Sequence, residues 1–188
     1  MKLANPAPLG LSGFALTTWM LSMVNAGWFS GDNVPLVLAC AFAFGGTAQI
    51  IAGLMEFRIG NIFGATAFSA YGAFWWWFAL LILLGGNHVL DLSRAGSSIG
   101  ACLLLWGVFT LGLWISTFRL TWLLFCIFLT LWIAFFLLGG GALLASPMLH
   151  QWGGWIGLLC GALAMYGSFA IVTNAVYGRE VVPVGTRR

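Results

Sequence analysis

Side chains that ionise are few in this chain, and the long stretches between them carry none. The 188 residues include seven Lys or Arg, four Asp or Glu and two His, and only 6% are charged. Intramembrane proteases, redox proteins and ion pumps place acidic or histidine side chains deep within apolar segments. Because the uncharged stretches offer none, the sequence predicts no catalytic residue, no metal site, no cofactor and no enzymatic activity.

Neutral polar side chains within the apolar stretches are the remaining candidates for chemistry. Phe14, Thr18, Leu21 and Asn25 recur at about 3.5 residues and therefore share one face of a helix. Lipid offers no hydrogen-bond partner, so the hydroxyl and the amide on this face must meet other helices or a water-filled path. An interhelical hydrogen bond and a place along a solute pathway are both open for these groups.

A second set of candidates surrounds Gln49, which lies between Gly45 and Gly53 at i, i+4, i+8 spacing. The two glycines let a neighbouring backbone approach, which brings the Gln49 amide against another helix or a narrow lumen. Glu56 is the acidic residue nearest an apolar stretch, and it precedes Arg58 by two residues. An ion pair at the edge of the membrane and a proton-linked or substrate-attracting group at a pore mouth are both open for Glu56.

The run Asn5-Pro6-Ala7-Pro8 predicts the start of the first helix. Asn can cap a helix, and proline is tolerated in the first turn because the N–H groups there have no helical partner. If this helix start faces a vestibule, its remaining N–H groups and positive dipole end favour a carboxylate. A plain helix start is the alternative.

These groups must be positioned by helices that cross a membrane. Hydrophobic residues make up 62% of the chain, compared with about 45–50% in soluble domains, which excludes a water-soluble protein. The ionisable residues leave six uncharged stretches, each long enough for one spanning helix of about 20 residues. The sequence predicts an all-α integral membrane protein with a single domain over 1–188 and spans near 8–26, 35–55, 61–84, 98–116, 122–144 and 155–176.

Basic residues are unequally divided between the two sides of such a protein. One side carries Lys2, Arg58, Arg119, Arg179, Arg187 and Arg188, and the other side carries Arg94 alone. Because cytoplasmic loops are enriched in Lys and Arg, we expect both termini in the cytoplasm and the protein in the inner membrane. Membrane lipid is an expected partner, and nucleic acid is not.

Several other side chains have structural expectations. The run Trp75-Trp76-Trp77 is expected to face lipid or another subunit. His88 and His150 are expected in loops on the outer side, either as solvated side chains or as pH sensors. The four cysteines fall within spans without the spacing of a metal site, and packing is the expected role.

The run Asn5-Pro6-Ala7-Pro8-Leu9-Gly10-Leu11 resembles the signature of the acetate uptake transporter family, which includes bacterial YaaH-type succinate-acetate permeases and fungal acetate transporters. Five further blocks agree in the same order: FGGTAQ at 44–49, GNIFG at 60–64, FSAYGAFW at 68–75, LWGVFT at 105–110 and GWIGLLCG at 154–161. Ile62 stands where the family commonly has Thr, and the loop around Arg119 is shorter than in relatives.

The resemblance implies a six-helix protomer in a hexameric ring, with one pathway per protomer for acetate and, in some members, succinate. It implies a constriction formed by Phe14, Tyr71 and Leu129, and a position at Ala164 that tunes the size of the acid. Thr18, Asn25, Gln49 and Glu56, together with the signature run, are the other expected pathway residues.

Acetate is almost entirely anionic at neutral pH, and removing its water is costly without replacement donors. With no buried carboxylate expected, the simplest proton coupling is that the acid carries its own proton, by symport or through a channel. Two alternatives remain open: a channel for a neutral solute such as urea or ammonia, and a membrane scaffold or sensor with no flux.

Overall fold

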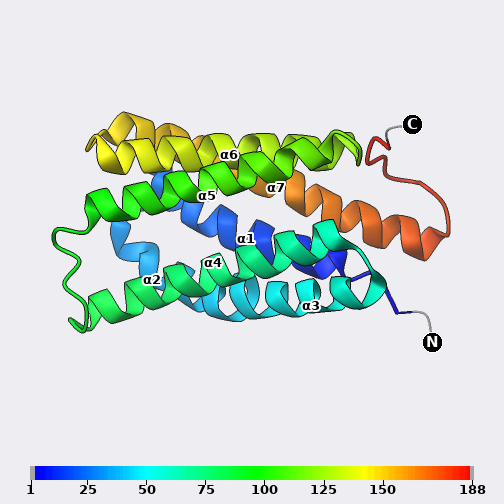
Figure 1. Ribbon diagram of the computed structural model, residues 1–188, viewed down its shortest axis with the longest axis horizontal. Coiled ribbons are helices and arrows are strands. Elements are labelled where there is room, and N and C mark those ends of the chain that lie inside the picture. Colours follow the sequence, from blue (N-terminus) through cyan, green and yellow to red (C-terminus); the bar gives the residue numbers. More distant parts are fainter. Residues whose placement is uncertain (1–2, 187–188) are drawn as a thin grey trace.

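Long apolar helices account for most of residues 3–186, the part of the chain that the computed structural model describes (Figure 1). Six helical segments there are long and apolar enough to cross a membrane, which confirms the predicted number. They are α1 (Ala7–Asn25), the composite segment Gly31–Ile59, α4 (Ile62–Gly86), α5 (Gly96–Thr117), α6 (Trp122–Leu143) and α7 (Pro147–Tyr177). Lys2, Arg187 and Arg188, which contribute to the charge bias, lie outside the described residues.

The composite segment contains a wide helical turn that ends directly before Gln49. After a short 3₁₀ turn it runs as α2 (Val34–Cys40), then as a π-helix over Ala41–Ala48, then as α3 (Gln49–Ile59). The Thr47 hydroxyl donates to the carbonyl of Phe42, five residues earlier, at 2.7 Å. π-Helical turns are rare and frequently accompany functional sites. This turn sets the direction from which α3 presents Gln49.

The last helix begins eight residues before its predicted start, so the expectation of a loop around His150 is wrong. The Ser146 side chain accepts a hydrogen bond from the Leu149 N–H at 3.4 Å, and Pro147 occupies the first turn. This arrangement is typical of a helix N-terminus. His150 therefore lies in the first turns of α7, where its side chain has a defined direction.

The expectation that the tryptophan run faces lipid or another subunit is wrong for Trp75. Its side chain is 3% exposed within the core, whereas Trp76 is 38% exposed and donates from Nε1 to the Thr47 hydroxyl at 3.3 Å. Consecutive residues on an α-helix point about 100° apart. Three tryptophans in a row therefore cannot share one lipid-facing surface.

Helix α1 lies between the α3–α4 pair and the α6–α7 pair, and it packs along α7 (Figure 1). The glycines at 154, 157 and 161 make this contact close: a Cβ added at Gly154 meets the Ala26 backbone nitrogen. The Trp19 indole donates to the Leu158 carbonyl at 2.9 Å across the same interface. This contact holds α1 in place relative to α6 and α7.

Replacing Gly154 by alanine should destabilise the protein by about 1–3 kcal/mol, because the added methyl overlaps backbone atoms of α1 that cannot move aside. Gly112→Ala in the second half of α5 is the matched control, since nothing lies within 4 Å of an added Cβ there. Thermal unfolding in detergent, followed by tryptophan fluorescence, compares the two. Equal midpoints would contradict a close α1–α7 contact.

Candidate functional site

Two cavities lie within the helical bundle, one toward each end. The first has a volume of about 200 Å³ and is lined near the starts of α1, α4 and α6, by residues that include Ala7, Asn61 and Thr121. The second has a volume of about 210 Å³ and is lined near the end of α1 and the start of α7, by residues that include Asn25 and His150. Because one water occupies about 30 Å³ in the liquid, each cavity has room for several waters or a small organic acid.

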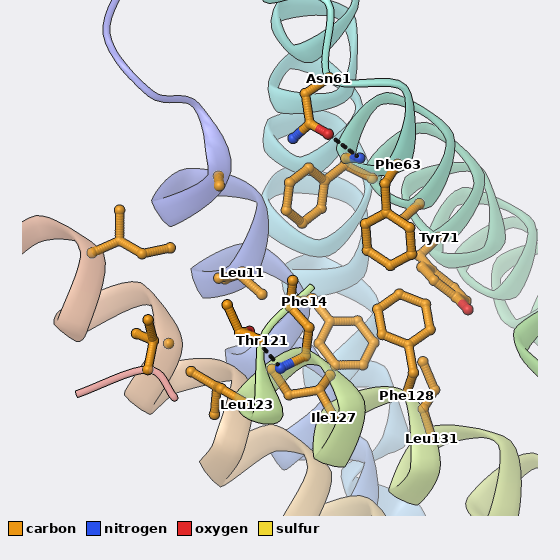
Figure 2. Close-up of a pocket in the computed structure, with 18 of the residues that line it drawn as sticks. Leu11, Phe14, Asn61, Phe63, Tyr71, Thr121, Leu123, Ile127, Phe128 and Leu131 are labelled. Carbon is orange, nitrogen blue, oxygen red and sulfur yellow. Dashed lines mark hydrogen bonds between the residues drawn. The ribbon is translucent and has the colours of Figure 1, made fainter. Parts of the chain in front are cut away.

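Three side chains line both cavities and therefore lie at the boundary between them: Phe14 of α1, Tyr71 of α4 and Leu131 of α6 (Figure 2). All three are buried, with exposed fractions of 6%, 3% and 6%. The ring centroids of Phe14 and Tyr71 are 6.0 Å apart. Two of the three positions expected at a constriction, Phe14 and Tyr71, thus lie together at this boundary.

The third expected position, Leu129, lines neither cavity, and Leu131 occupies the boundary instead. Side chains two residues apart on an α-helix point about 200° from each other. Leu129 and Leu131 therefore point to nearly opposite sides of α6. The loop between α5 and α6 contains only residues 118–121.

The hydroxyl of Tyr71 is committed to a partner on α5. It donates to the Thr110 Oγ1 at 2.9 Å, and the Thr110 hydroxyl in turn donates to the Trp106 carbonyl at 2.7 Å. Thr110 is fully buried. Since the hydroxyl proton is already used, Tyr71 contributes chiefly its aromatic ring to the boundary. Thr110 was not predicted as a site residue, although it lies in the LWGVFT block at 105–110 and follows Trp106 by four residues, the spacing of one helical turn.

Gln49 is the polar group of the first cavity that lacks a full set of partners. Its side chain is 1% exposed, and Oε1 has no hydrogen-bond partner. Apart from Tyr71, the other polar side chains there cap helices (Figure 2): Asn61 accepts from the Gly64 N–H at 3.3 Å, and Thr121 accepts from the Leu124 N–H at 3.1 Å. A buried amide oxygen without a partner is costly, which points to a water or a solute beside Gln49.

The second cavity contains the whole predicted face of the first helix. Phe14, Thr18, Leu21 and Asn25 all line it, so the prediction of a shared face is confirmed. The Thr18 hydroxyl is buried without a hydrogen-bond partner. His150 donates from Nε2 to the Asn25 Oδ1 at 3.1 Å, which leaves the amide N–H groups of Asn25 as donors. His150 was missed as a site residue because it was expected in a loop.

The signature run contributes mainly to the structure of the first helix. Asn5 Oδ1 accepts the Ala7 N–H at 2.9 Å, as expected of a capping side chain, although Pro6 occupies the N-cap position of α1. Ala7 and Leu11 line the first cavity. The other five members of the run line neither cavity: Asn5, Pro6, Pro8, Leu9 and Gly10.

Glu56 is completely buried near the end of α3, which corrects the expectation that no acidic side chain is buried. Its Oε2 accepts from the Asn61 Nδ2 at 2.7 Å, and its Oε1 has no hydrogen-bond partner. The expected edge pair with Arg58 is therefore wrong. Glu56 lines neither cavity, but it contacts Asn61, which lines the first.

Ala164 is fully buried in the core and lines neither cavity. An effect of this residue on solute size therefore has to act through its neighbours. The four cysteines are free thiols. Among the described residues, no group of three His, Cys, Asp or Glu side chains is placed to hold a metal ion.

Comparison with known proteins gives extensive matches to transporters. The chain is 42% identical over 184 residues to the succinate-acetate/proton symporter SatP of Escherichia coli strain K12, which covers 98% of this chain and 96% of that protein. It is 39% identical over 197 residues to acetate permease A of Emericella nidulans, covering 97% of this chain and 66% of that protein. Ammonia transport outward protein 2 of Saccharomyces cerevisiae is 39% identical over 175 residues, covering 90% of this chain and 61% of that protein.

The fold also matches a solved structure over nearly the whole chain. The structure of the bacterial acetate channel SatP matches with a TM-score of 0.94 and 42% identity, covering 98% of this chain and 100% of that chain. Together with the six long apolar helices, this match identifies an all-helical, multi-pass membrane protein. Residues 1–183 match the GPR1/FUN34/yaaH family, and the chain belongs to this family.

Proposed function

We propose that this protein carries acetate, and other small carboxylates such as succinate, across a membrane through the two cavities and the boundary between them. The observation that carries the proposal is the placement of Phe14, Tyr71 and Leu131 between two cavities with buried, unpartnered polar groups. The similarity to the succinate-acetate/proton symporter SatP and to acetate permease A supports it.

The chemistry of the two cavities and of the boundary suits a small carboxylic acid. An acid leaving water loses hydrogen bonds, which is expensive unless the protein replaces them. The Gln49 amide on one side, and the Thr18 hydroxyl and Asn25 amide on the other, are the groups we assign to that replacement. The apolar boundary between them then passes the methyl and carboxyl groups of acetate, and the unbranched chain of succinate, while opposing bulkier, branched solutes.

The proton is best carried by the acid itself. At the boundary no polar group is available to solvate a carboxylate, because the Tyr71 hydroxyl already donates to Thr110. Protonation removes the charge at the step where the charge costs most. Glu56 is the alternative proton carrier, because it is a buried carboxyl group that contacts a residue of the first cavity.

Labelled acetate uptake into proteoliposomes should rise as the external pH falls. The pKa of acetate lies near that of Asp and Glu, so lowering the pH by about two units from neutral raises the neutral fraction about 100-fold. Protein-free liposomes give the leak of neutral acid through lipid, which is subtracted. Uptake that does not depend on pH after this subtraction would contradict the proposal.

Glu56→Gln separates the two proton carriers within the same experiment. If the acid carries its own proton, this variant keeps the pH dependence of the wild type. Loss of that dependence in Glu56→Gln, with acetate uptake retained, would assign the proton to Glu56.

Ammonia is a second candidate solute, favoured by the 39% identity to ammonia transport outward protein 2. Neutral cavities also suit a neutral solute. Ammonia flux can be followed by the internal pH of the same proteoliposomes. Ammonia permeation without acetate uptake would select this candidate.

We further propose that both termini face the cytoplasm, that the protein resides in the inner membrane and that six protomers assemble into a ring. Arg58 lies in the last turn of α3, and Arg119 and Arg179 follow α5 and α7, all at the end of the bundle where α1 begins, whereas Arg94 lies at the other end. The positive-inside tendency supports this orientation.

A further inference from the structure

The C-terminal segment 178–186 folds back from the end of α7 toward the start of α6 (Figure 1). Gly178 ends α7 with a φ of 64°, a left-handed conformation that glycine adopts without strain and that reverses the chain. None of the nine residues is buried. Their position is therefore determined mainly by specific hydrogen bonds.

Two side chains of α7 hold this segment. The Asn174 Nδ2 donates to the Val182 carbonyl at 2.8 Å, and its Oδ1 accepts the N–H groups of Val181 and Val182 at 2.7 and 2.9 Å. The Tyr166 hydroxyl donates to the Pro183 carbonyl at 2.7 Å. Both side chains therefore bind the backbone of the segment.

The start of α6 holds the other side of the segment. The Trp122 N–H donates to the Gly185 carbonyl at 2.8 Å, and the Leu123 N–H donates to the Val184 carbonyl at 3.3 Å. N–H groups in the first turn of a helix have no partner within the helix. The segment therefore provides acceptors that α6 needs, and Thr121 and Thr186 lie opposite each other in an antiparallel bridge.

This placement brings the segment onto the first cavity. Val184 lines the cavity together with Thr121 and Leu123, the residues beside which it is bound. Among the described residues beyond α7, only Val184 contributes to the cavity wall. The wall is thus completed by a stretch of exposed chain that is attached by separable hydrogen bonds, the kind of region that opens locally at low cost.

We propose that residues 178–186 are a lid over the first cavity, that Asn174 and Tyr166 latch it closed, and that it must move for a solute to pass. The inference rests on the proposed transport function. Gly178 and Gly185, both with positive φ, are the positions that we assign as hinges. Val184 is the lid residue that contacts a solute in the closed state.

Locking the lid is the first test, with Thr121→Cys and Thr186→Cys combined. The Trp122 hydrogen bond to Gly185 makes Thr121 and Thr186 a non-hydrogen-bonded antiparallel pair, in which side chains are closest and a disulfide is favourable. Oxidation should reduce acetate uptake at least tenfold, and a reductant should restore it.

Thr121→Cys alone is the control for loss of the helix cap. A pair that fails to cross-link would contradict the placement of the lid, and unchanged uptake in the cross-linked protein would contradict its movement.

Releasing the latch is the second test, and it does not depend on transport. A cysteine placed at Leu124, which lines the first cavity, reports access to the cavity from water. In detergent, Asn174→Ala combined with Tyr166→Phe should increase its reaction rate with a soluble maleimide at least fivefold. The chain without the Leu124 cysteine gives the background from the native thiols. Tyr177→Phe, at an exposed position of the same helix end, is the matched control.

The two tests distinguish failure of the lid from failure of the proposed function. An unchanged Leu124→Cys labelling rate in the unlatched variant overturns the lid whether or not acetate is transported. If the wild type carries no acetate in proteoliposomes but labelling accelerates on unlatching, the transport function fails and the lid stands as a cover of the cavity alone.

Discussion

Leu131→Ala is expected to raise the ratio of lactate uptake to acetate uptake by about tenfold or more. Leu131 is 6% exposed and lines both cavities, so truncating it widens the boundary that every solute has to cross. Lactate exceeds acetate by one carbon and one hydroxyl. A difference of one methylene in an apolar pocket changes selectivity by about 10–200-fold, which gives the scale of the expected effect. Competing uptake of the two labelled acids in proteoliposomes measures the ratio directly.

Leu129→Ala is the matched control, because it makes the same truncation two residues away on the same helix. Leu129 lines neither cavity, and its variant should keep the wild-type ratio. The comparison also tests the assignment derived from the resemblance against the position in the structure. A selectivity change in Leu129→Ala without one in Leu131→Ala would show that the boundary was assigned to the wrong side of α6.

Gln49→Leu is expected to lower acetate uptake about 10–100-fold while leaving the protein at least as stable. Without the Gln49 amide a polar group of the acid is left without a partner, which costs about 1–3 kcal/mol, and each 1.4 kcal/mol is a factor of ten. The Gln49 Oε1 has no partner, so an apolar side chain of similar size removes an unsatisfied group from the core. Opposite changes in uptake and stability distinguish a solute-binding residue from a packing residue.

Gln151→Leu serves as the control for this variant. The Gln151 amide donates to the Ala26 carbonyl at 3.3 Å and lies outside both cavities, so uptake should be unaffected. Thermal unfolding in detergent gives the stability of both variants. Wild-type uptake in Gln49→Leu, or a large loss of stability, would assign Gln49 to helix packing.

The features predicted correctly from the sequence depend on residues close together in the chain. Uncharged stretches of sufficient length determine the number of spans, since each span must satisfy its own backbone in lipid. The 3.5-residue spacing from Phe14 to Asn25 places these side chains on one face, and that face lines the second cavity. The hydrogen bond from the Ala7 N–H to Asn5 was predictable for the same reason, because the two residues are only two positions apart.

The tertiary structure decided the features that depend on how separate helices meet. The choice of Leu131 over Leu129 depends on the rotation of α6 against α1 and α4, which hydropathy does not specify. The burial of Glu56 depends on the turn that brings Asn61 back onto it. His150 reaches Asn25 across 125 residues, and Asn174 binds a segment that turns back after α7. Composition and periodicity determine which segments enter the membrane, but only packing between helices determines which side chains face a common cavity, because that depends on rotations and contacts between distant parts of the chain.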